Sequence, residues 1–295
     1  MTTLPAGSKI QLNAGVDTLL LMAHLSAEDV VSSENREEIR MKKRMGLAVL
    51  LCALLAVGAA LAEPIPVTLS DSGVVCADPN VVSDGKTVVF PLAGEFELTG
   101  ELSNGQIIVN CEMDEQLTLI LNNVTIHNEN GAAILVRQCT SKLNIVLADG
   151  SVNTLSDGGT YALDSNDEPN GVLFSKDDMA ISGTGTLNIT ALYMDGIVCK
   201  DDLRIRSGNY NISAARNGIR GKDSLEIFDG VFNITAGNDG IKATNEKDAE
   251  KGYVAISGGE VHIVCGDDPV SVVTRLTITG GTVEATVDPS LAKDD

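Results

Sequence analysis

Asp195-Gly196-Ile197 recurs as Asn217-Gly218-Ile219 and as Asp239-Gly240-Ile241, and an earlier copy reads Asn170-Gly171-Val172. The glycines of the four copies are 25, 22 and 22 residues apart. A polar residue, a glycine and an aliphatic residue that return at a nearly fixed period are typical of a solenoid, in which each repeat packs only against its neighbours.

Two short alternating segments follow each copy of this turn. After the second copy they are Leu203-Arg204-Ile205 and Tyr210-Asn211-Ile212-Ser213, and after the third copy they are Leu225-Glu226-Ile227 and Phe232-Asn233-Ile234-Thr235. Alternation with a period of two predicts β-strands, and no segment beyond residue 63 shows a convincing helical period. We therefore expect an all-β, right-handed parallel β-helix with about 22 residues per rung, because crossovers between parallel strands are overwhelmingly right-handed.

The rung register predicts where side chains point. Equivalent residues of successive rungs should stack at about 4.8 Å, the spacing between paired strands. Two inward columns are expected: Leu187 with Tyr210 and Phe232, and Ile189 with Ile212 and Ile234. Three Asn-x-Ser/Thr sequences recur because the strand recurs, and we interpret them as an outward polar ladder rather than as glycosylation sites: Asn188, Asn211 and Asn233.

The N-terminal part carries a different signal. Met41 is followed by Lys-Lys-Arg, by an almost wholly apolar run and by Ala60-Leu61-Ala62, which fits a signal-peptidase site. We expect residues 41–62 to be a cleaved secretory signal peptide, since the run is short for a membrane span; an uncleaved anchor is the alternative. Arg36-Glu37-Glu38 can be encoded by a purine run that resembles a ribosome-binding site. We therefore expect translation to start at Met41, with residues 1–40 an upstream extension outside the true protein; the alternative is a genuine amphipathic segment.

The acidic balance limits the partners of the expected mature chain. Residues 1–62 hold six basic and six acidic side chains, so the rest of the chain keeps the whole net charge of −20. This charge argues against nucleic acid and anionic membrane as partners and favours solubility or cation binding. We expect a monomer that is secreted or held at the cell surface, with no stable membrane span after cleavage. The five remaining cysteines are odd in number and irregularly spaced, which favours free, buried thiols.

The expected mature chain divides into three parts. Residues 63–84 are expected to form a lead-in or cap, residues 85–288 the β-helix, and residues 289–295 a tail. Two insertions are expected between rungs: residues 151–169, rich in Ser, Asp, Gly and Asn, and the charged residues 245–252.

Stacking brings acidic residues into columns. The candidate metal ligands are Asp177, Asp178, Asp195, Asp201, Asp202, Asp223, Asp239 and Asp268. Carboxylates one rung apart repel by roughly 1 kcal/mol in water and by about 3–4 kcal/mol at an effective dielectric near 20. We expect calcium to offset this repulsion, because it takes oxygen ligands from Asp, Asn and main-chain carbonyls. The alternative is neutralisation by the parallel column of Lys176, Lys200 and Lys222.

One tandem string resembles the secreted bacterial carbohydrate-binding domain proteins. It includes Asp195-Gly196-Ile197, Lys200-Asp201-Asp202-Leu203, Lys222-Asp223-Ser224-Leu225 and Asn238-Asp239-Gly240-Ile241-Lys242. The similarity extends over about residues 85–288. It implies a right-handed parallel β-helix shaped like pectate lyases, calcium sites on the helix, and binding of a plant cell-wall polysaccharide such as cellulose or polygalacturonate. The resemblance does not imply catalysis.

Three functions are compatible with these observations. The first is a non-catalytic, calcium-stabilised polysaccharide-binding module. The second is a calcium-dependent, pectate-type lyase, in which Arg220 or Lys222 would abstract the proton α to a uronate carboxylate. The third is a structural surface protein or adhesin. Stacking on sugar rings is a weak basis for any of them, because the chain has no tryptophan and only 3% aromatic residues.

Overall fold

A computed structural model describes residues 63–292 of the chain. Within this range it contains 25 β-strands and one short 3₁₀-helix, η1 (Pro289–Leu291), so the all-β prediction is confirmed. The expectations for residues 1–40, for residues 41–62 and for the last three residues of the tail lie outside the described residues. No helix in the described part is long and apolar enough to cross a membrane.

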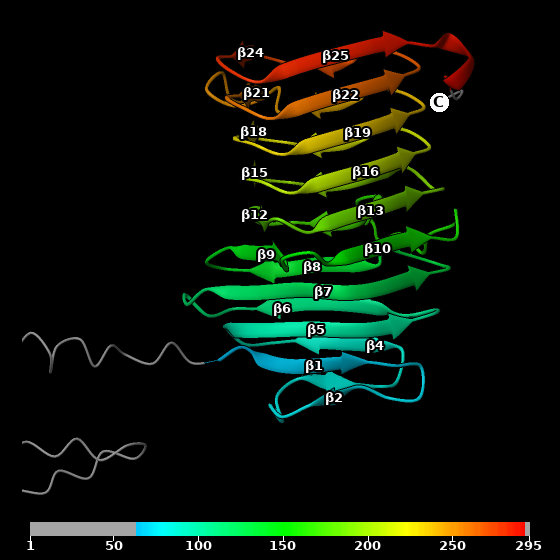
Figure 1. The fold of residues 1–295 in the computed structure, drawn as a ribbon, viewed down its shortest axis with the longest axis vertical. Helices are drawn as coiled ribbons and strands as arrows, with labels where there is room; N and C mark the ends of the chain where they lie inside the picture. Colours follow the sequence, from blue (N-terminus) through cyan, green and yellow to red (C-terminus); the bar gives the residue numbers. More distant parts are fainter. Residues whose placement is uncertain (1–62, 293–295) are drawn as a thin grey trace, which may run out of the picture. The chain divides into compact units, whose positions relative to one another are not determined.

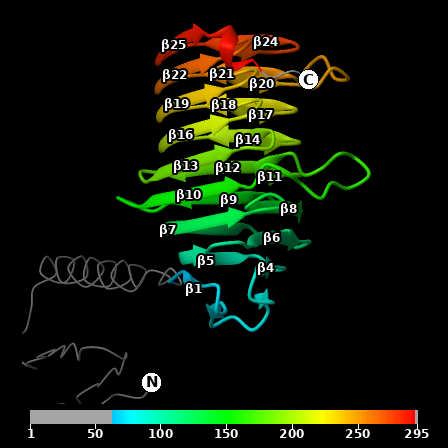
Figure 2. The ribbon, with the colours of Figure 1, turned by 90° about the vertical axis from the view of Figure 1, so that its right-hand side faces the viewer.

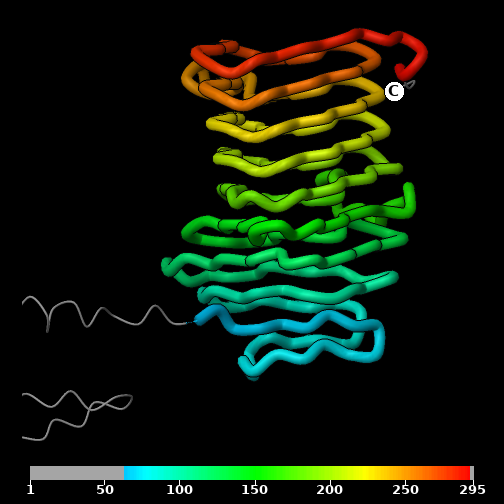
Figure 3. The backbone as a smooth tube through the Cα atoms, in the orientation of Figure 1, coloured from blue at the N-terminus to red at the C-terminus, as the bar shows by residue number. Residues whose placement is uncertain are grey.

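The strands form two sheets that wind together into a stack of coils (Figure 1, Figure 3). The nine-stranded sheet forms one wall of the stack, called the third wall below. Its strands are β3 (Val82–Ser83), β4 (Thr87–Phe90), β6 (Gln106–Cys111), β8 (Ile134–Cys139), β11 (Gly171–Ser175), β14 (Asp195–Cys199), β17 (Ile219–Gly221), β20 (Ile241–Ala243) and β23 (Val270–Ser271).

The 16-stranded sheet bends into two more walls at the long strands β5 (Gly94–Leu102) and β7 (Leu117–Asn128). The first half of β7 pairs with β9 and its second half pairs with β10. The first wall consists of β9 (Leu143–Leu147), β12 (Met179–Gly183), β15 (Asp202–Ile205), β18 (Ser224–Ile227), β21 (Tyr253–Ile256) and β24 (Arg275–Ile278). The second wall consists of β10 (Val152–Asp157), β13 (Thr186–Ala191), β16 (Asn209–Ala214), β19 (Val231–Ala236), β22 (Glu260–Cys265) and β25 (Thr282–Val287).

Successive coils pair in parallel on all three walls, which confirms the parallel solenoid. Tyr210 is paired with Phe232, a step of 22 residues, whereas Phe232 is paired with Val261, a step of 29 residues. The longer step contains the charged insertion that was predicted at residues 245–252. The coil length therefore varies around the period that the repeated turn suggests.

The N-terminal end of the stack differs from its middle. β1 (Ile65–Leu69) extends the 16-stranded sheet in parallel with β5, but β2 (Val75–Cys76) pairs antiparallel with β1. β3 likewise pairs antiparallel with β4 at the edge of the third wall. Residues 63–84, which were expected to form a lead-in or cap, hold β1, β2 and β3.

Both predicted inward columns are confirmed. Leu187, Tyr210 and Phe232 are paired in register and are fully buried. The rings of Tyr210 and Phe232 stack with centroids 4.6 Å apart and an interplanar angle of 7°. The second buried column consists of Ile189, Ile212 and Ile234. On the outer side of the same strands, the asparagine ladder is linked by side-chain bonds: Asn211 donates to Asn188 (2.9 Å) and Asn233 donates to Asn211 (3.0 Å).

Glycine is required at the corner between the first and second walls. Gly208 and Gly230 have φ angles of +123° and +126°, a region that side chains other than glycine rarely adopt. A Cβ at Gly230 would also lie 2.8 Å from the carbonyl oxygen of Gly208 on the coil below. The recurring glycine therefore lets successive corners approach closely enough to keep the coils in register.

One boundary prediction is wrong. Residues 151–169 were expected to form a surface loop, but Val152–Asp157 is the strand β10, paired with both β7 and β13. The segment lacks the usual apolar alternation because the polar residue Asn153 occupies an inward position, where it is fully buried. The strand tolerates this residue because Asn153 accepts from the Val124 amide (3.1 Å) and donates to Ser151 Oγ (2.9 Å). The inserted loop is therefore shorter and covers residues 158–170.

Candidate functional site

On the third wall, four successive coils carry a basic residue at the same register position. Ser175 of β11 pairs with Val136 on one side and with Cys199 on the other, and Cys199 pairs in turn with Gly221. The residues that follow these positions are therefore in register; we call them the cationic row: Arg137, Lys176, Lys200 and Lys222. Since paired strands are about 4.8 Å apart, the row presents one positive charge per coil along the solenoid axis.

An open cleft of about 700 Å³ lies beside the start of the cationic row. Its basic and amide lining residues are Lys86, Arg137, Lys176, Asn104, Gln106, Asn128 and Asn130. A second groove of about 440 Å³ is lined by Lys200, Lys222 and Lys251, and it shares Lys176 and Glu168 with the cleft. Ligand pockets commonly have volumes of about 300–1,000 Å³. Together the two depressions form a continuous charged and polar surface along the corner, which also includes the acidic residues Asp164, Glu168, Asp201 and Asp223.

The loop between β10 and β11, residues 158–170, stands out from the stack beside this surface (Figure 2). It places the Glu168 carboxylate 3.1 Å from Lys176 Nζ and 2.7 Å from Lys200 Nζ. Burial raises the pKa of Glu168, but hydrogen bonds from Lys200 and Lys176 outweigh this effect and the pKa is lowered overall. Asp164 of the same loop lies 3.3 Å from Lys176 Nζ. Arg137, by contrast, makes no ion pair with any residue in the range 63–292.

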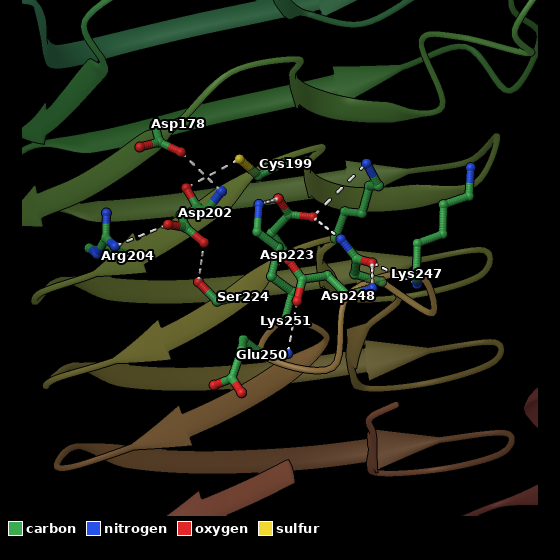
Figure 4. Close-up of polar contacts among 12 residues, drawn as sticks. Asp178, Cys199, Asp202, Arg204, Asp223, Ser224, Lys247, Asp248, Glu250 and Lys251 are labelled. Atoms are coloured by element: carbon green, nitrogen blue, oxygen red, sulfur yellow. Dashed lines mark hydrogen bonds and ion pairs between the residues drawn. The ribbon is translucent and has the colours of Figure 1, made fainter. Parts of the chain in front are cut away.

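The aspartates that follow the residues of the cationic row mostly bind groups other than the lysines of that row. Asp177 accepts from the Cys139 amide of the coil below (2.5 Å). Asp223 accepts from Asn245 Nδ2 (2.6 Å). It also accepts from Lys251 Nζ (2.5 Å) (Figure 4). Of the three predicted lysine–aspartate neighbours, only Lys222 and Asp223 come within 4.0 Å. Among the described residues, the cationic row is therefore neutralised mainly by the loop and not by the aspartate column.

Asp178 and Asp202, at or just before the start of strands in the first wall, form hydrogen bonds between successive coils. Asp178 Oδ1 accepts from the amide of Asp202 on the following coil (3.1 Å). Asp202 in turn accepts from Ser224 Oγ (2.7 Å) and from Arg204 (3.2 Å) (Figure 4). Ser224, which replaces the aspartate of this column, is thus a hydrogen-bond donor to the acid below it.

The aspartates of the repeated turn bind the main chain of neighbouring coils. Asp195 accepts from the Asn217 amide (3.0 Å), and Asp239 accepts from the Asp268 amide (3.1 Å). Lys242 Nζ lies 2.6 Å from Asp239, which is only 2% exposed. These carboxylates satisfy turn amides that would otherwise be buried without a partner, which explains why an acid or an amide recurs at this position.

The predicted metal ligands lie in two separate groups at the two ends of the third-wall strands. Asp177, Asp178, Asp201, Asp202 and Asp223 follow the strands, whereas Asp195, Asp239 and Asp268 lie at or near their starts. Within residues 63–292, no three Asp, Glu, His or Cys side chains are gathered as a metal-ion cluster.

Asp201 is the acid with the most unusual environment. Burial, together with the carboxylates of Asp223 and Asp178, raises its pKa to about 6. An unfolded aspartate titrates near about 3.9. Between these two values the folded state holds more protons than the unfolded state, so this group makes stability fall as the pH rises from about 4 to about 6.

We predict that Asp201→Asn removes this part of the pH dependence. The variant should be more stable than the wild type at neutral pH, because asparagine removes a negative charge that lies near Asp223 and Asp178. We expect a gain of only about 1 kcal/mol, because solvent screens a partly exposed carboxylate. Thermal unfolding in chelator, followed by circular dichroism from about pH 4 to pH 7, measures the difference. Asp267→Asn, an exposed site with the same charge change, is the control. Equal pH profiles for the two variants would contradict the prediction.

The two basic residues considered for a lyase have different surroundings. Arg220 Nε lies 2.7 Å from Asp195 Oδ2, and another guanidinium nitrogen donates to Asn170 Oδ1 (2.8 Å). Both contacts use guanidinium N–H groups as donors, so Arg220 is held in place by Asp195 and Asn170. Lys222 is more open, with a side chain 48% exposed, and belongs to the cationic row.

Among the residues that form the cationic row and its contacts with the loop, Arg137 and Glu168 were missed in the sequence. Arg137 follows Asn130-Gly131, which resembles the repeated turn, but its coil is less regular, and its position after Val136 of β8 places it in the row. Glu168 lies in a loop, where no periodic pattern predicts contacts. A register alignment of the third-wall strands would have found Arg137, but no sequence signal identifies Glu168.

The described residues thus define a parallel β-solenoid with a charged, polar surface that contains the cationic row along one corner. A family model described as carbohydrate-binding domain-containing protein matches residues 84–293, and the chain belongs to this family. The resemblance seen in the repeated turns is therefore confirmed.

Two comparisons with known proteins give one relative each. A carbohydrate-binding domain-containing protein of Acetivibrio thermocellus is 33% identical over 123 residues, which cover 41% of this chain and 43% of that protein. The chain thus matches less than half the length of this relative. A solved structure of a polysaccharide lyase-like protein from C. thermocellum, a gadolinium derivative, has a TM-score of 0.64 at 30% identity. That match covers 76% of this chain and 95% of the other.

Proposed function

We propose that this protein is a non-catalytic module that binds an acidic polysaccharide, such as a plant polygalacturonate, along the cationic row. The observation that carries the proposal is the register of four cations on successive coils in a chain with a net charge of −20. A polyuronate repeats its carboxylate along a linear chain, so it matches a linear array of cations. The family membership supports carbohydrate as the ligand class.

Binding without cleavage is favoured by the surroundings of Arg220. Its guanidinium donates to Asp195 and Asn170, so these nitrogens are engaged within the chain rather than with a ligand. The proposal includes a right-handed winding of the coils, which the crossover preference of parallel strands supports. It also includes an extracellular location, which the predicted signal peptide supports.

The test is retention of purified protein on insoluble polygalacturonate and on cellulose. We expect stronger retention on polygalacturonate, weakened by raising the salt concentration, because screening shortens the range of ion pairs. Ultraviolet-absorbing, unsaturated products would instead assign a lyase activity. Failure to bind any polysaccharide would favour a structural surface role.

We also propose that calcium stabilises the fold near Asp201. This carboxylate makes no ion pair within the described range, and burial together with the neighbouring carboxylates of Asp223 and Asp178 raises its pKa. Because the side chains are not gathered as a metal-ion cluster, the ion would also have to recruit main-chain oxygens or water.

Melting temperatures with added calcium and with chelator test this proposal. A ligand at a hundredfold excess over its dissociation constant adds about 2.7 kcal/mol of stability, provided that it binds only the folded state. That corresponds to a rise of roughly 5–10 °C for a domain of this size. The double variant Asp201→Ala, Asp202→Ala should show a smaller rise. Identical melting curves with calcium and chelator would favour neutralisation by groups within the chain.

A further inference from the structure

We propose that residues 162–168 act as a tethered competitor of the polysaccharide. In this proposal the Glu168 carboxylate occupies the position between Lys176 and Lys200 that a ligand carboxylate takes, and bound ligand displaces the segment. We call residues 162–168 the strap. The inference rests on the proposed function and adds its regulation.

The first observation is the placement of Glu168. Its carboxylate lies 3.1 Å from Lys176 Nζ and 2.7 Å from Lys200 Nζ, so one acid bridges two successive members of the cationic row. Its side chain is only 12% exposed. Carboxylate is also the group that a uronate ligand presents, so Glu168 and a ligand would compete for the same two cations.

The second observation is how weakly the strap is attached. Residues 162–167 are all exposed, and Glu168 is the one strap residue that is not. Apart from Glu168, the contacts of the strap with the body include the Asp164–Lys176 ion pair (3.3 Å) and the bond from the Ala162 amide to the Asn130 carbonyl (3.1 Å). Opening would therefore break a few polar contacts without exposing a buried apolar side chain, which is typical of segments that open readily.

The third observation is that both ends of the strap are anchored. On one side, the ring of Tyr161 stacks on Tyr193 with centroids 4.4 Å apart, and its hydroxyl donates to Asp157 (2.9 Å). On the other side, Asn170 accepts from Arg220 (2.8 Å). The strap can thus leave the cationic row while the rest of the loop stays in place, and it returns when the ligand dissociates.

The strap lowers the apparent affinity because only the open form is free to bind. The apparent dissociation constant equals the intrinsic one divided by the open fraction, so a strap closed about 90% of the time weakens binding about tenfold. The opposite role is also testable: if Glu168 instead held the two lysines in place for the ligand, its removal would weaken binding.

The test is Glu168→Gln, with Asp167→Asn as the matched control. Both changes remove one negative charge from the same loop, but Asp167 is exposed and its side chain has no partner among the described residues. Asparagine also tolerates the positive φ of +57° at this position. We expect Glu168→Gln to bind soluble polygalacturonate about tenfold more tightly than wild type, and Asp167→Asn to change affinity by less than twofold. Equal or weaker binding by Glu168→Gln would overturn the inference.

Hydrogen exchange gives an independent readout on the wild-type protein. Amides of residues 162–168 should exchange faster when polygalacturonate is bound, since the ligand displaces the strap; slower exchange would mean that the strap closes over the ligand and would refute the inference. If the wild type and both variants fail to bind polygalacturonate at all, the proposed function itself fails. If binding depends on the cationic row but not on Glu168, only the strap inference fails.

Discussion

Replacing Phe232 by alanine is expected to lower the free energy of unfolding by about 3–5 kcal/mol, the usual effect of truncating a buried aromatic side chain. Phe232 is fully buried, and its ring stacks on Tyr210 of the coil below at 4.6 Å. The coil above contributes Val261 to the same column. A cavity at Phe232 therefore weakens two interfaces between coils at once, and a solenoid has no other contacts to compensate.

Thermal unfolding measures the effect of Phe232→Ala. At roughly 2–4 °C per kcal/mol for a domain of this size, the melting temperature should fall by about 10 °C. Phe228→Ala is the matched control, because Phe228 is 46% exposed and only four residues away in sequence. Its removal should change stability by less than about 0.5 kcal/mol. Similar losses for the two variants would mean that the inward register has been drawn incorrectly.

The parts of the fold that repeat could be predicted from the sequence. Leu187, Tyr210 and Phe232 occupy equivalent positions of an alternating segment, and a solenoid converts such equivalence directly into contact. The same logic placed Lys176, Lys200 and Lys222 in one column. Alternation thus determines both the core and the outer columns wherever the period is regular.

The predictions failed where the period is interrupted. β10 was assigned to a loop because Asn153 and its neighbours are polar, yet Asn153 is buried and hydrogen-bonded. Glu168 contacts two lysines through the path of a loop, which no short-range pattern encodes. The stacking of coils also predicts which acidic residues are neighbours, but it does not predict which hydrogen-bond donors contact them. The donors to Asp177 and Asp223 could therefore be identified only from the structure.

Removing the three lysines of the cationic row should abolish most binding to acidic polysaccharide. A partly exposed ion pair contributes about 1 kcal/mol, so Lys176→Ala, Lys200→Ala and Lys222→Ala together should remove about 3 kcal/mol, roughly a hundredfold in affinity. Binding of polygalacturonate by titration calorimetry at about 0.15 M salt measures this, because screening there limits the effect of distant charges to about 8 Å.

The control for the triple variant must carry the same change in net charge. Lys142→Ala, Arg206→Ala and Lys247→Ala also remove three positive charges, but these residues lie outside the cationic row. If the chain repelled polyuronate only through its net charge of −20, both triple variants would lose affinity equally. If the row is the binding site, the control should stay within about threefold of the wild type while the row variant loses roughly a hundredfold. The difference between the two triple variants therefore separates recognition by a local array of cations from the electrostatics of the whole chain.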